Sequence, residues 1–156
     1  MTPPLRERIS RLLGRRPPEM QVAALCLSET TGQVLLVTSR GTGRWIVPKG
    51  WPMPGRTLAG AAMQEAWEEA GVKGRIGDGE IGRYHYEKDQ DRGFAIPVEV
   101  RVFPLYVDCM KERFPEVDQR KRRWFAPTEA ANMVAETGLK QILRALPAPQ
   151  ERHSGG

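Results

Sequence analysis

The sequence predicts a single α/β domain in which helices pack on a β-sheet. The chain has 156 residues, of which 40% are hydrophobic and 28% charged, as is typical of one globular domain with its own core. Short apolar runs with strand character alternate with segments of helical character. There is no internal repeat and no sign of a second core, so one domain is the simplest interpretation.

The domain is expected to occupy residues 20–146. Residues 1–19 are interpreted as a basic N-terminal arm, whose spaced leucines and isoleucine predict one short amphipathic helix between proline-containing segments. Residues 147–156 contain few core-forming side chains, and we expect a flexible tail there.

The first half of the domain is predicted to contain a hairpin, a short strand and a loop. Apolar runs at 22–27 and 34–37 are separated by a polar turn that ends at Gly32, which is a hairpin signal. Residues 44–47 predict a shorter strand. The stretch 48–55 that follows is rich in proline and glycine, so we expect a loop.

The second half is predicted to contain two longer strands, one short strand and further helix. Residues 75–87 and 96–107 have strand character, and a polar turn separates them. Residues 123–125 predict a last short strand. Pro127 opens a helical stretch, and Thr137 is expected to cap a final helix.

Between these halves lies a short helix with an unusual charge pattern. Glu65, Glu68 and Glu69 share one face of it, because residues spaced i, i+3 and i+4 are neighbours on a helix, where like charges repel by about 0.2–0.5 kcal/mol per pair. The acids also lie in the last turns before Gly71, where the helix dipole disfavours negative charge. This pattern is typical of a site for a hard cation such as Mg²⁺ or Mn²⁺. The alternative is a solvated acidic face.

The opposite side of the same helix is expected to pack on the sheet. A helical wheel places an apolar face away from the acids, made of Ala59, Met63, Ala66, Trp67 and Ala70. The sequence has neither a CxxC nor an HExxH motif, which argues against zinc.

The overall charge and the cysteines limit the partners and the compartment. The formal net charge of +5 suits an anionic partner, whether phosphate, polyphosphate or nucleic acid. No apolar run approaches the roughly 18 residues of a membrane span, so no membrane partner is expected. Cys26 and Cys109 lie in apolar runs without metal spacing. We therefore expect reduced core thiols in a cytoplasmic protein.

The segment from Gly50 to Val72 resembles the Nudix box, G-x5-E-x7-R-E-U-x-E-E-x-G-U, where U is apolar. The matching positions are Gly50, Glu65, Ala66, Glu68, Glu69, Gly71 and Val72. Arg56 stands where the box has Glu, and Gln64 stands where it has Arg. In the family these two positions support the loop–helix–loop and orient the catalytic glutamate. Either another polar pairing replaces them here, or activity is weakened.

Flanking segments extend the resemblance to roughly residues 20–146. Residues 44–50, 68–74 and 122–125 look like those of the diphosphoinositol polyphosphate phosphohydrolase branch, which cleaves diphosphoinositol polyphosphates and diadenosine polyphosphates. The resemblance implies the Nudix α/β/α sandwich with a mixed β-sheet. It also implies a Mg²⁺-dependent diphosphate hydrolase, with Mn²⁺ as the alternative cofactor.

The resemblance also implies roles for the matching residues. Glu65 and Glu69 would be catalytic, with Glu65 acting as a metal ligand or as the general base. Glu65, Glu68 and Glu69 would hold the metal together with a backbone carbonyl of Lys49 or Gly50. An acid from outside the box often assists in this family, and the candidates are Glu87, Glu112 and Glu116.

Basic residues are expected to bind the rest of the polyphosphate, because Arg suits bidentate phosphate contacts and Lys a point charge. The candidates are Arg40, Arg44, Lys49 and Arg101. Each one taken singly is more often a solvated surface residue. The run from Arg120 to Arg123 is interpreted as a solvated charge run, with phosphate or RNA binding as the alternative.

Two other functions stay open. One is removal of pyrophosphate from a nucleotide or from the 5′ end of RNA, although an RNA partner is not favoured. The other is a Nudix-fold binding module that has lost catalysis. The intact glutamates argue against that module, whereas Arg56 and Gln64 keep it as an alternative. The sequence does not indicate the oligomeric state.

Overall fold

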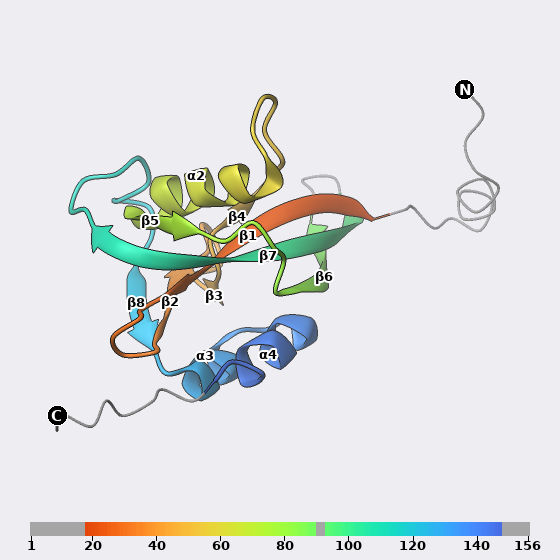
Figure 1. Cartoon of the computed structure of the whole chain (residues 1–156). Helices are drawn as coiled ribbons and strands as arrows, with labels where there is room; N and C mark the ends of the chain where they lie inside the picture. The colour runs from red at the N-terminus through yellow and green to blue at the C-terminus, as the bar shows by residue number, and fades with distance from the viewer. Residues whose placement is uncertain (1–17, 90–92, 148–156) are drawn as a thin grey trace, which may run out of the picture.

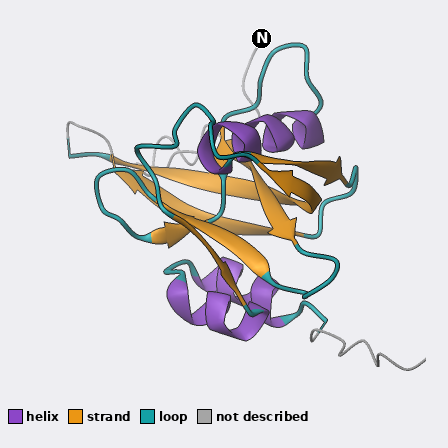
Figure 2. Ribbon diagram, turned by 90° about the vertical axis from the view of Figure 1, so that its left-hand side faces the viewer, coloured by secondary structure: helices purple, strands orange, loops and turns teal. Residues whose placement is uncertain are grey.

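A β-sheet lies between two layers of helix in the computed structural model, which describes residues 18–89 and 93–147 (Figure 1). Helix α2 (Leu58–Ala70) covers one face of the eight-stranded sheet. Helices α3 (Pro127–Met133) and α4 (Thr137–Arg144) cover the other face, as the turned view in Figure 2 also shows. The predicted α/β/α sandwich is confirmed. None of the helices in the described ranges has the length and apolar character needed to cross a bilayer.

The sheet is mixed, as predicted, because its two central strands run parallel. These are β1 (Glu19–Leu27) and β7 (Ala95–Met110). The other long edge of β7 pairs antiparallel with β5 (Val72–Ile76) and then with β6 (Gly82–Asp89). The 16-residue strand β7 therefore joins the two halves of the sheet.

The other edge of β1 is shared by two antiparallel partners. One is β2 (Val34–Thr38), which in turn pairs with β3 (Trp45–Ile46) and β8 (Arg122–Phe125). The other is β4 (Lys49–Gly50), within the stretch that the sequence predicted as a loop. That short pairing places residues 49 and 50 beside the middle of the sheet.

The core forms two layers because successive side chains of a strand point to opposite faces. Along β1, Val22 and Ala24 face α2, whereas Ala23 and Leu25 face α3 and α4. All four are fully buried. A strand covered on both faces appears in the sequence as the continuous apolar run from which it was predicted.

Three sequence-based expectations about the fold were wrong. Thr137 does not cap the final helix, because it is the first residue of α4 and Glu136 occupies the N-cap position. Residues 75–87 do not form one strand but two, β5 and β6, separated by turn-forming residues at 77–79 that interrupt the pairing. Cys26 is buried as expected, whereas Cys109 is exposed, because near the end of β7 its side chain belongs to neither core layer, although its neighbour Met110 packs on the α2 side. The cytoplasmic location stays a prediction. The predicted N-terminal helix lies outside the described residues.

Candidate active site

Helix α2 is fixed at both ends by local sequence. The Thr57 side chain accepts a hydrogen bond from the Gly60 amide at 3.0 Å, which caps the first turn. At the other end Gly71 has φ +67°, a left-handed conformation that glycine adopts without steric cost. The predicted stop at Gly71 is confirmed. These two ends determine which residues of the helix reach the sheet.

The buried stripe of α2 is rotated toward the acids compared with the helical-wheel prediction. Ala61 and Ala62 are fully buried, whereas Met63 and Trp67 are only half-buried. Glu69 is 5% exposed, so it belongs to the helix–sheet interface and not to a solvated face. A buried carboxylate requires donors or cations close by.

The Glu69 carboxylate has a donor on each oxygen. Its Oε2 accepts from the Lys49 backbone amide at 3.0 Å, and its Oε1 pairs with Arg120 Nη2 at 2.9 Å. The side chains of Glu69 and Arg120 are each 6% exposed. The carboxylate is therefore held between strand β4 and the segment that leads into β8.

Glu65 lies against Gly50, one step along β4. A Cβ atom on Gly50 would overlap the Glu65 carboxyl group. Glycine at this position therefore leaves the space that the Glu65 carboxylate occupies. Strand β4 thus meets both Glu65 and Glu69 on the face of the sheet that α2 covers.

Burial and crowding make these carboxyl groups resist ionisation. Burial raises the pKa of Glu65 to about 7, with repulsion from Glu69, Glu68 and Glu116 adding to it and Arg120 opposing it. Burial also raises the pKa of Glu69 to about 7, outweighing the lowering by Arg120 and the Lys49 amide. Crowded carboxyl groups of this kind are stabilised in their ionised form by a bound cation.

Glu68 and Glu116 complete the acidic surroundings. The Glu68 carboxylate accepts a hydrogen bond from the side-chain Nε2 of Gln64 at 3.4 Å. The Glu68 backbone carbonyl accepts from the backbone N–H of Glu116 at 2.9 Å. Glu116 Oε1 lies 3.3 Å from Arg120 Nη2. Of the three acids proposed from outside the box, Glu116 is therefore the one placed beside Glu69.

The donor set suits a hard divalent cation, although it is not assembled as a cluster. Within the described ranges, no three His, Cys, Asp or Glu side chains converge as a ready metal site. The carboxylates of Glu65, Glu68 and Glu69, together with Glu116, nevertheless supply the oxygen ligands that Mg²⁺ and Mn²⁺ prefer. The raised pKa values of Glu65 and Glu69 mark the place where a bound cation would be most stabilising.

Two of the basic candidates, Arg40 and Arg44, lie near the box, but only Arg40 borders the acids. Arg40 Nη1 lies 3.3 Å from Glu116 Oε1 and donates to Gln119 at 3.0 Å, so it borders the acids. Arg44 is exposed and reaches only Thr42, at 3.4 Å. Neither guanidinium touches Glu65 or Glu69, and both remain available to an incoming anion.

The backbone amide of Lys49 reaches the acids of α2, whereas its side chain lies on the opposite face of the sheet. Its register partner is Ala23, whose side chain faces α3 and α4. The ammonium lies 4.8 Å from the centre of the Tyr86 ring, and burial lowers the Lys49 pKa against the opposing effect of Glu69. Only the Lys49 amide reaches the acids of α2.

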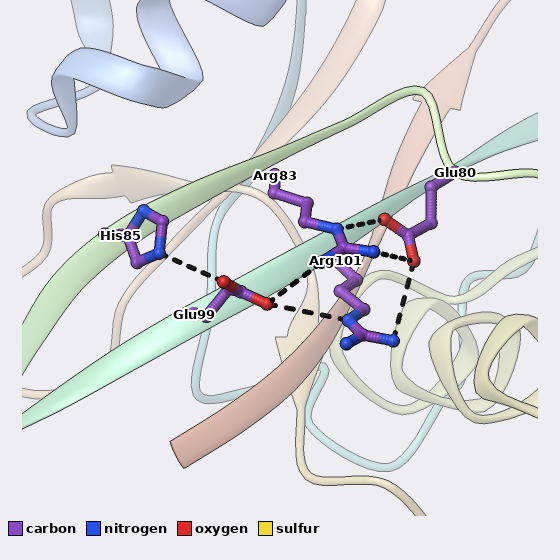
Figure 3. Close-up of polar contacts among 5 residues, drawn as sticks. All are labelled: Glu80, Arg83, His85, Glu99 and Arg101. Atoms are coloured by element: carbon purple, nitrogen blue, oxygen red, sulfur yellow. Dashed lines mark hydrogen bonds and ion pairs between the residues drawn. The ribbon is translucent and has the colours of Figure 1, made fainter. Parts of the chain in front are cut away.

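Arg101 belongs to a network of charges on β6, β7 and the loop before β6 (Figure 3). Its guanidinium lies 3.7 Å from Glu80 and 3.6 Å from Glu99, and the same acids pair with Arg83. Val22 separates Arg101 from Gly50 in the strand register. Among the described residues, Arg101 forms ion pairs with Glu80 and Glu99 and with none of the three α2 glutamates.

Sequence reasoning missed Arg120, which the structure places at the centre of the site. It was expected in a solvated charge run, yet its side chain contacts Glu69, Glu116 and the Thr38 carbonyl. The Arg122 guanidinium is likewise engaged and donates to the Ala70 carbonyl at 2.7 Å. A basic run has no periodicity that distinguishes buried from solvated members, so no sequence signal identified either residue.

Comparison with known families and sequences agrees with this geometry. The model of the NUDIX domain matches residues 17–146. Diphosphoinositol polyphosphate phosphohydrolase 3-beta of Bos taurus is 38% identical over 118 residues, covering 73% of this chain and 68% of the relative. Nudix hydrolase 4 of Arabidopsis thaliana is 31% identical over 113 residues, covering 72% of this chain and 53% of the relative.

Solved structures show the same fold. A MutT protein from Methanosarcina mazei Go1 superimposes with a TM-score of 0.62 at 20% identity, covering 83% of this chain and 93% of its own. The C. elegans Ap4A hydrolase gives a TM-score of 0.57 at 19% identity, covering 82% and 95%. At these identities the likeness concerns the fold alone.

Proposed function

Because the chain belongs to the Nudix hydrolase family, we propose that it hydrolyses a diphosphate bond in an anionic polyphosphate with the help of Mg²⁺ or Mn²⁺. The proposed substrates are diphosphoinositol polyphosphates, as the name of the bovine relative suggests, and diadenosine polyphosphates. The observation that carries this proposal is the meeting of Glu65 and Glu69 with Gly50 and Lys49 at one loop–helix junction.

The acids of α2 would hold the cation. Glu65, Glu68 and Glu69 are the proposed ligands, with a backbone carbonyl of Lys49 or Gly50 and the nearby Glu116 as further oxygen donors. When bound, the ion supplies neutralisation of phosphate oxygens and a lowered pKa for bound water. Positioning and electrostatics account for most of the catalysis of phosphoryl transfer, so the fixed carboxylates matter more than any one nucleophile.

The remaining residues would orient the substrate and move the proton. Glu65, which lies against Gly50 at the junction of β4 and α2, is proposed as a metal ligand or as the general base that takes the proton from the attacking water. Arg40 and Arg44 are the proposed contacts for the rest of the polyphosphate, whereas the Lys49 ammonium lies on the other face of the sheet and Arg101 is paired with Glu80 and Glu99. Of these, Arg40 lies beside the acids through Glu116.

Incubation of the purified protein with a substrate panel tests the proposal. The panel contains diphosphoinositol phosphates, diadenosine polyphosphates, nucleotide sugars, nucleoside triphosphates and triphosphorylated RNA, each with Mg²⁺, with Mn²⁺ and with EDTA. We expect metal-dependent release of phosphate or nucleotide from the first two classes and none with EDTA.

The other outcomes distinguish the alternative functions. Faster turnover of nucleoside triphosphates or triphosphorylated RNA would replace the proposed substrate class with a pyrophosphohydrolase acting on nucleotides or RNA ends. Tight binding of one compound without turnover of any would contradict the enzyme proposal. It would instead support a binding module, in line with the altered box positions Arg56 and Gln64.

A further inference from the structure

Arg120 is a buried arginine whose contacts all lie at the candidate active site. Its Nη2 lies 2.9 Å from Glu69 Oε1 and 3.3 Å from Glu116 Oε1. Its Nη1 donates to the Thr38 carbonyl at 3.0 Å, at the end of β2. One planar guanidinium therefore ties the Glu69 carboxylate to the sheet and to the segment that carries Glu116.

The residues that replace the two lost box positions do not make these contacts. Gln64 donates to Glu68 at 3.4 Å, and Arg56 is exposed in the loop before α2. Neither residue contacts Glu69. The partners of Glu69 in the structure are Arg120 and the Lys49 backbone amide. The donor that orients Glu69 thus comes from a segment 51 residues further along the chain.

We propose that Arg120 is the positioning residue of this active site, and that it supplies from outside the box the orienting contact that Gln64 and Arg56 do not. The proposal rests on the proposed function, since it concerns how Glu69 is held for the cation and the substrate. Arg120 acts through Glu69 and does not touch the substrate.

The geometry of the guanidinium explains why an arginine is needed. Its two terminal nitrogens serve different partners at the same time, the Thr38 carbonyl on one side and two carboxylates on the other. Lysine keeps the positive charge but offers a single nitrogen, which cannot span both sides. Replacement by lysine therefore changes the orientation of Glu69 and leaves the charge of the site unchanged.

Arg120→Lys is the test variant, and Arg122→Lys is its matched control. Arg122 also joins the β8 end of the chain to α2, through the Ala70 carbonyl, but its guanidinium contacts none of the carboxylates. We measure kcat and KM for the best substrate of the panel, and Mn²⁺ affinity by electron paramagnetic resonance without substrate.

Arg120→Lys should lower kcat and Mn²⁺ affinity by about 10- to 100-fold, the range found for residues that orient metal ligands. Its KM should stay within about twofold, because uniform substrate binding is not affected. Arg122→Lys should leave kcat and Mn²⁺ affinity unchanged within about twofold, even if it lowers the melting temperature. Wild-type values of both quantities in Arg120→Lys would overturn the proposal.

A double-mutant cycle with Glu69→Gln separates positioning from a general structural effect. If Arg120 acts through Glu69, adding Arg120→Lys to Glu69→Gln should cause no further loss of Mn²⁺ affinity. If Arg120→Lys lowers Mn²⁺ affinity as much in the Glu69→Gln variant as in the unchanged protein, Arg120 does not act through Glu69. With glutamine at position 69 no carboxylate there is left unpaired when Arg120 is replaced, so the double variant can be compared with Glu69→Gln even if Arg120→Lys alone folds poorly.

The two readouts keep this inference apart from the proposed function. If the unchanged protein hydrolyses nothing in the panel, the proposed function fails, whereas the Mn²⁺ cycle still decides whether Arg120 positions Glu69. If the protein turns over substrate and the cycle shows independent effects, the function stands and the positioning proposal is wrong. Failure of the unchanged protein to bind Mn²⁺ would contradict the positioning proposal as well.

Discussion

At the scale of single residues, the site depends on the donors that reach the Glu69 carboxyl group. A buried ion pair contributes little net stability, but leaving one of its charges unpaired costs about 3–5 kcal/mol. Arg120 and the Lys49 amide meet this requirement from two different segments. The contacts that stabilise the Glu69 carboxylate in the buried helix–sheet interface are thus the same ones that orient it toward the proposed metal site.

Glu69→Gln should cut turnover while the protein stays folded. The glutamine carbonyl can still accept from the Lys49 amide, and Arg120 keeps Glu116 as its ionic partner. The negative charge offered to a cation is lost, so we expect kcat to fall by about 10²- to 10³-fold, as for other single groups that stabilise charge.

Steady-state kinetics with Mg²⁺ and thermal unfolding measure the two effects. Glu129→Gln is the control, because Glu129 is an exposed acid on α3, on the other face of the sheet. It should leave kcat unchanged. Near-normal rates in Glu69→Gln would remove Glu69 from the active site.

At the scale of secondary structure, the important junction lies between the two-residue strand β4 and helix α2. Pairing of Lys49 with Ala23 and of Gly50 with Val22 fixes β4 against the central strand. The cap at Thr57 and the stop at Gly71 fix the helix. The two elements are so close that a side chain at position 50 would displace the Glu65 carboxyl group.

Gly50→Ala should impair activity more than stability. The added methyl group would meet the end of the Glu65 side chain, which moves by changing rotamer without rearrangement of the backbone. A displacement of about 1 Å in an active site can cost about 100-fold in rate. We expect a loss of that order in kcat, with a melting temperature close to that of the unchanged protein.

Gly79→Ala is the matched control for this substitution. A Cβ atom on Gly79 would meet no other atom within 4 Å, so this variant should keep both its rate and its melting temperature. Comparison of kcat and thermal unfolding for the two alanine variants checks the prediction. An unimpaired Gly50→Ala enzyme would show that Glu65 does not need its observed position.

At the scale of the whole molecule, the sheet is covered on both faces, and the two cysteines report this layering. Cys26 lies in β1 within the core layer under α2, whereas Cys109 is exposed near the end of β7. Burial raises the pKa of the Cys26 thiol to about 12. Since the thiolate is the reactive form, Cys26 should be inert in the folded protein.

Thiol labelling at pH 8 should therefore modify one cysteine in the folded protein and two after denaturation. The raised pKa means that Cys26 would begin to form thiolate only several pH units higher, so the stoichiometry of one should hold throughout the neutral range. Titration with an alkylating reagent followed by mass spectrometry identifies the residue. Rapid modification of Cys26 would contradict the layered core.

The sequence alone determined the features that depend on neighbouring residues or on a fixed spacing. The Gly71 stop, the acids at i, i+3 and i+4, and the continuous apolar run of β1 were all correctly predicted, because each reflects local geometry. The box spacing from Gly50 to Val72 indicated the family and, through it, the α/β/α sandwich.

Only the tertiary structure decided which charges meet. Whether Arg120 is solvated or buried depends on how the segment before β8 packs against α2, and a charge run carries no information about that. The same holds for Glu116, which became the acid beside Glu69 through its contact with Arg120. Contacts between residues about 50 positions apart arise from packing, and local sequence patterns do not encode them.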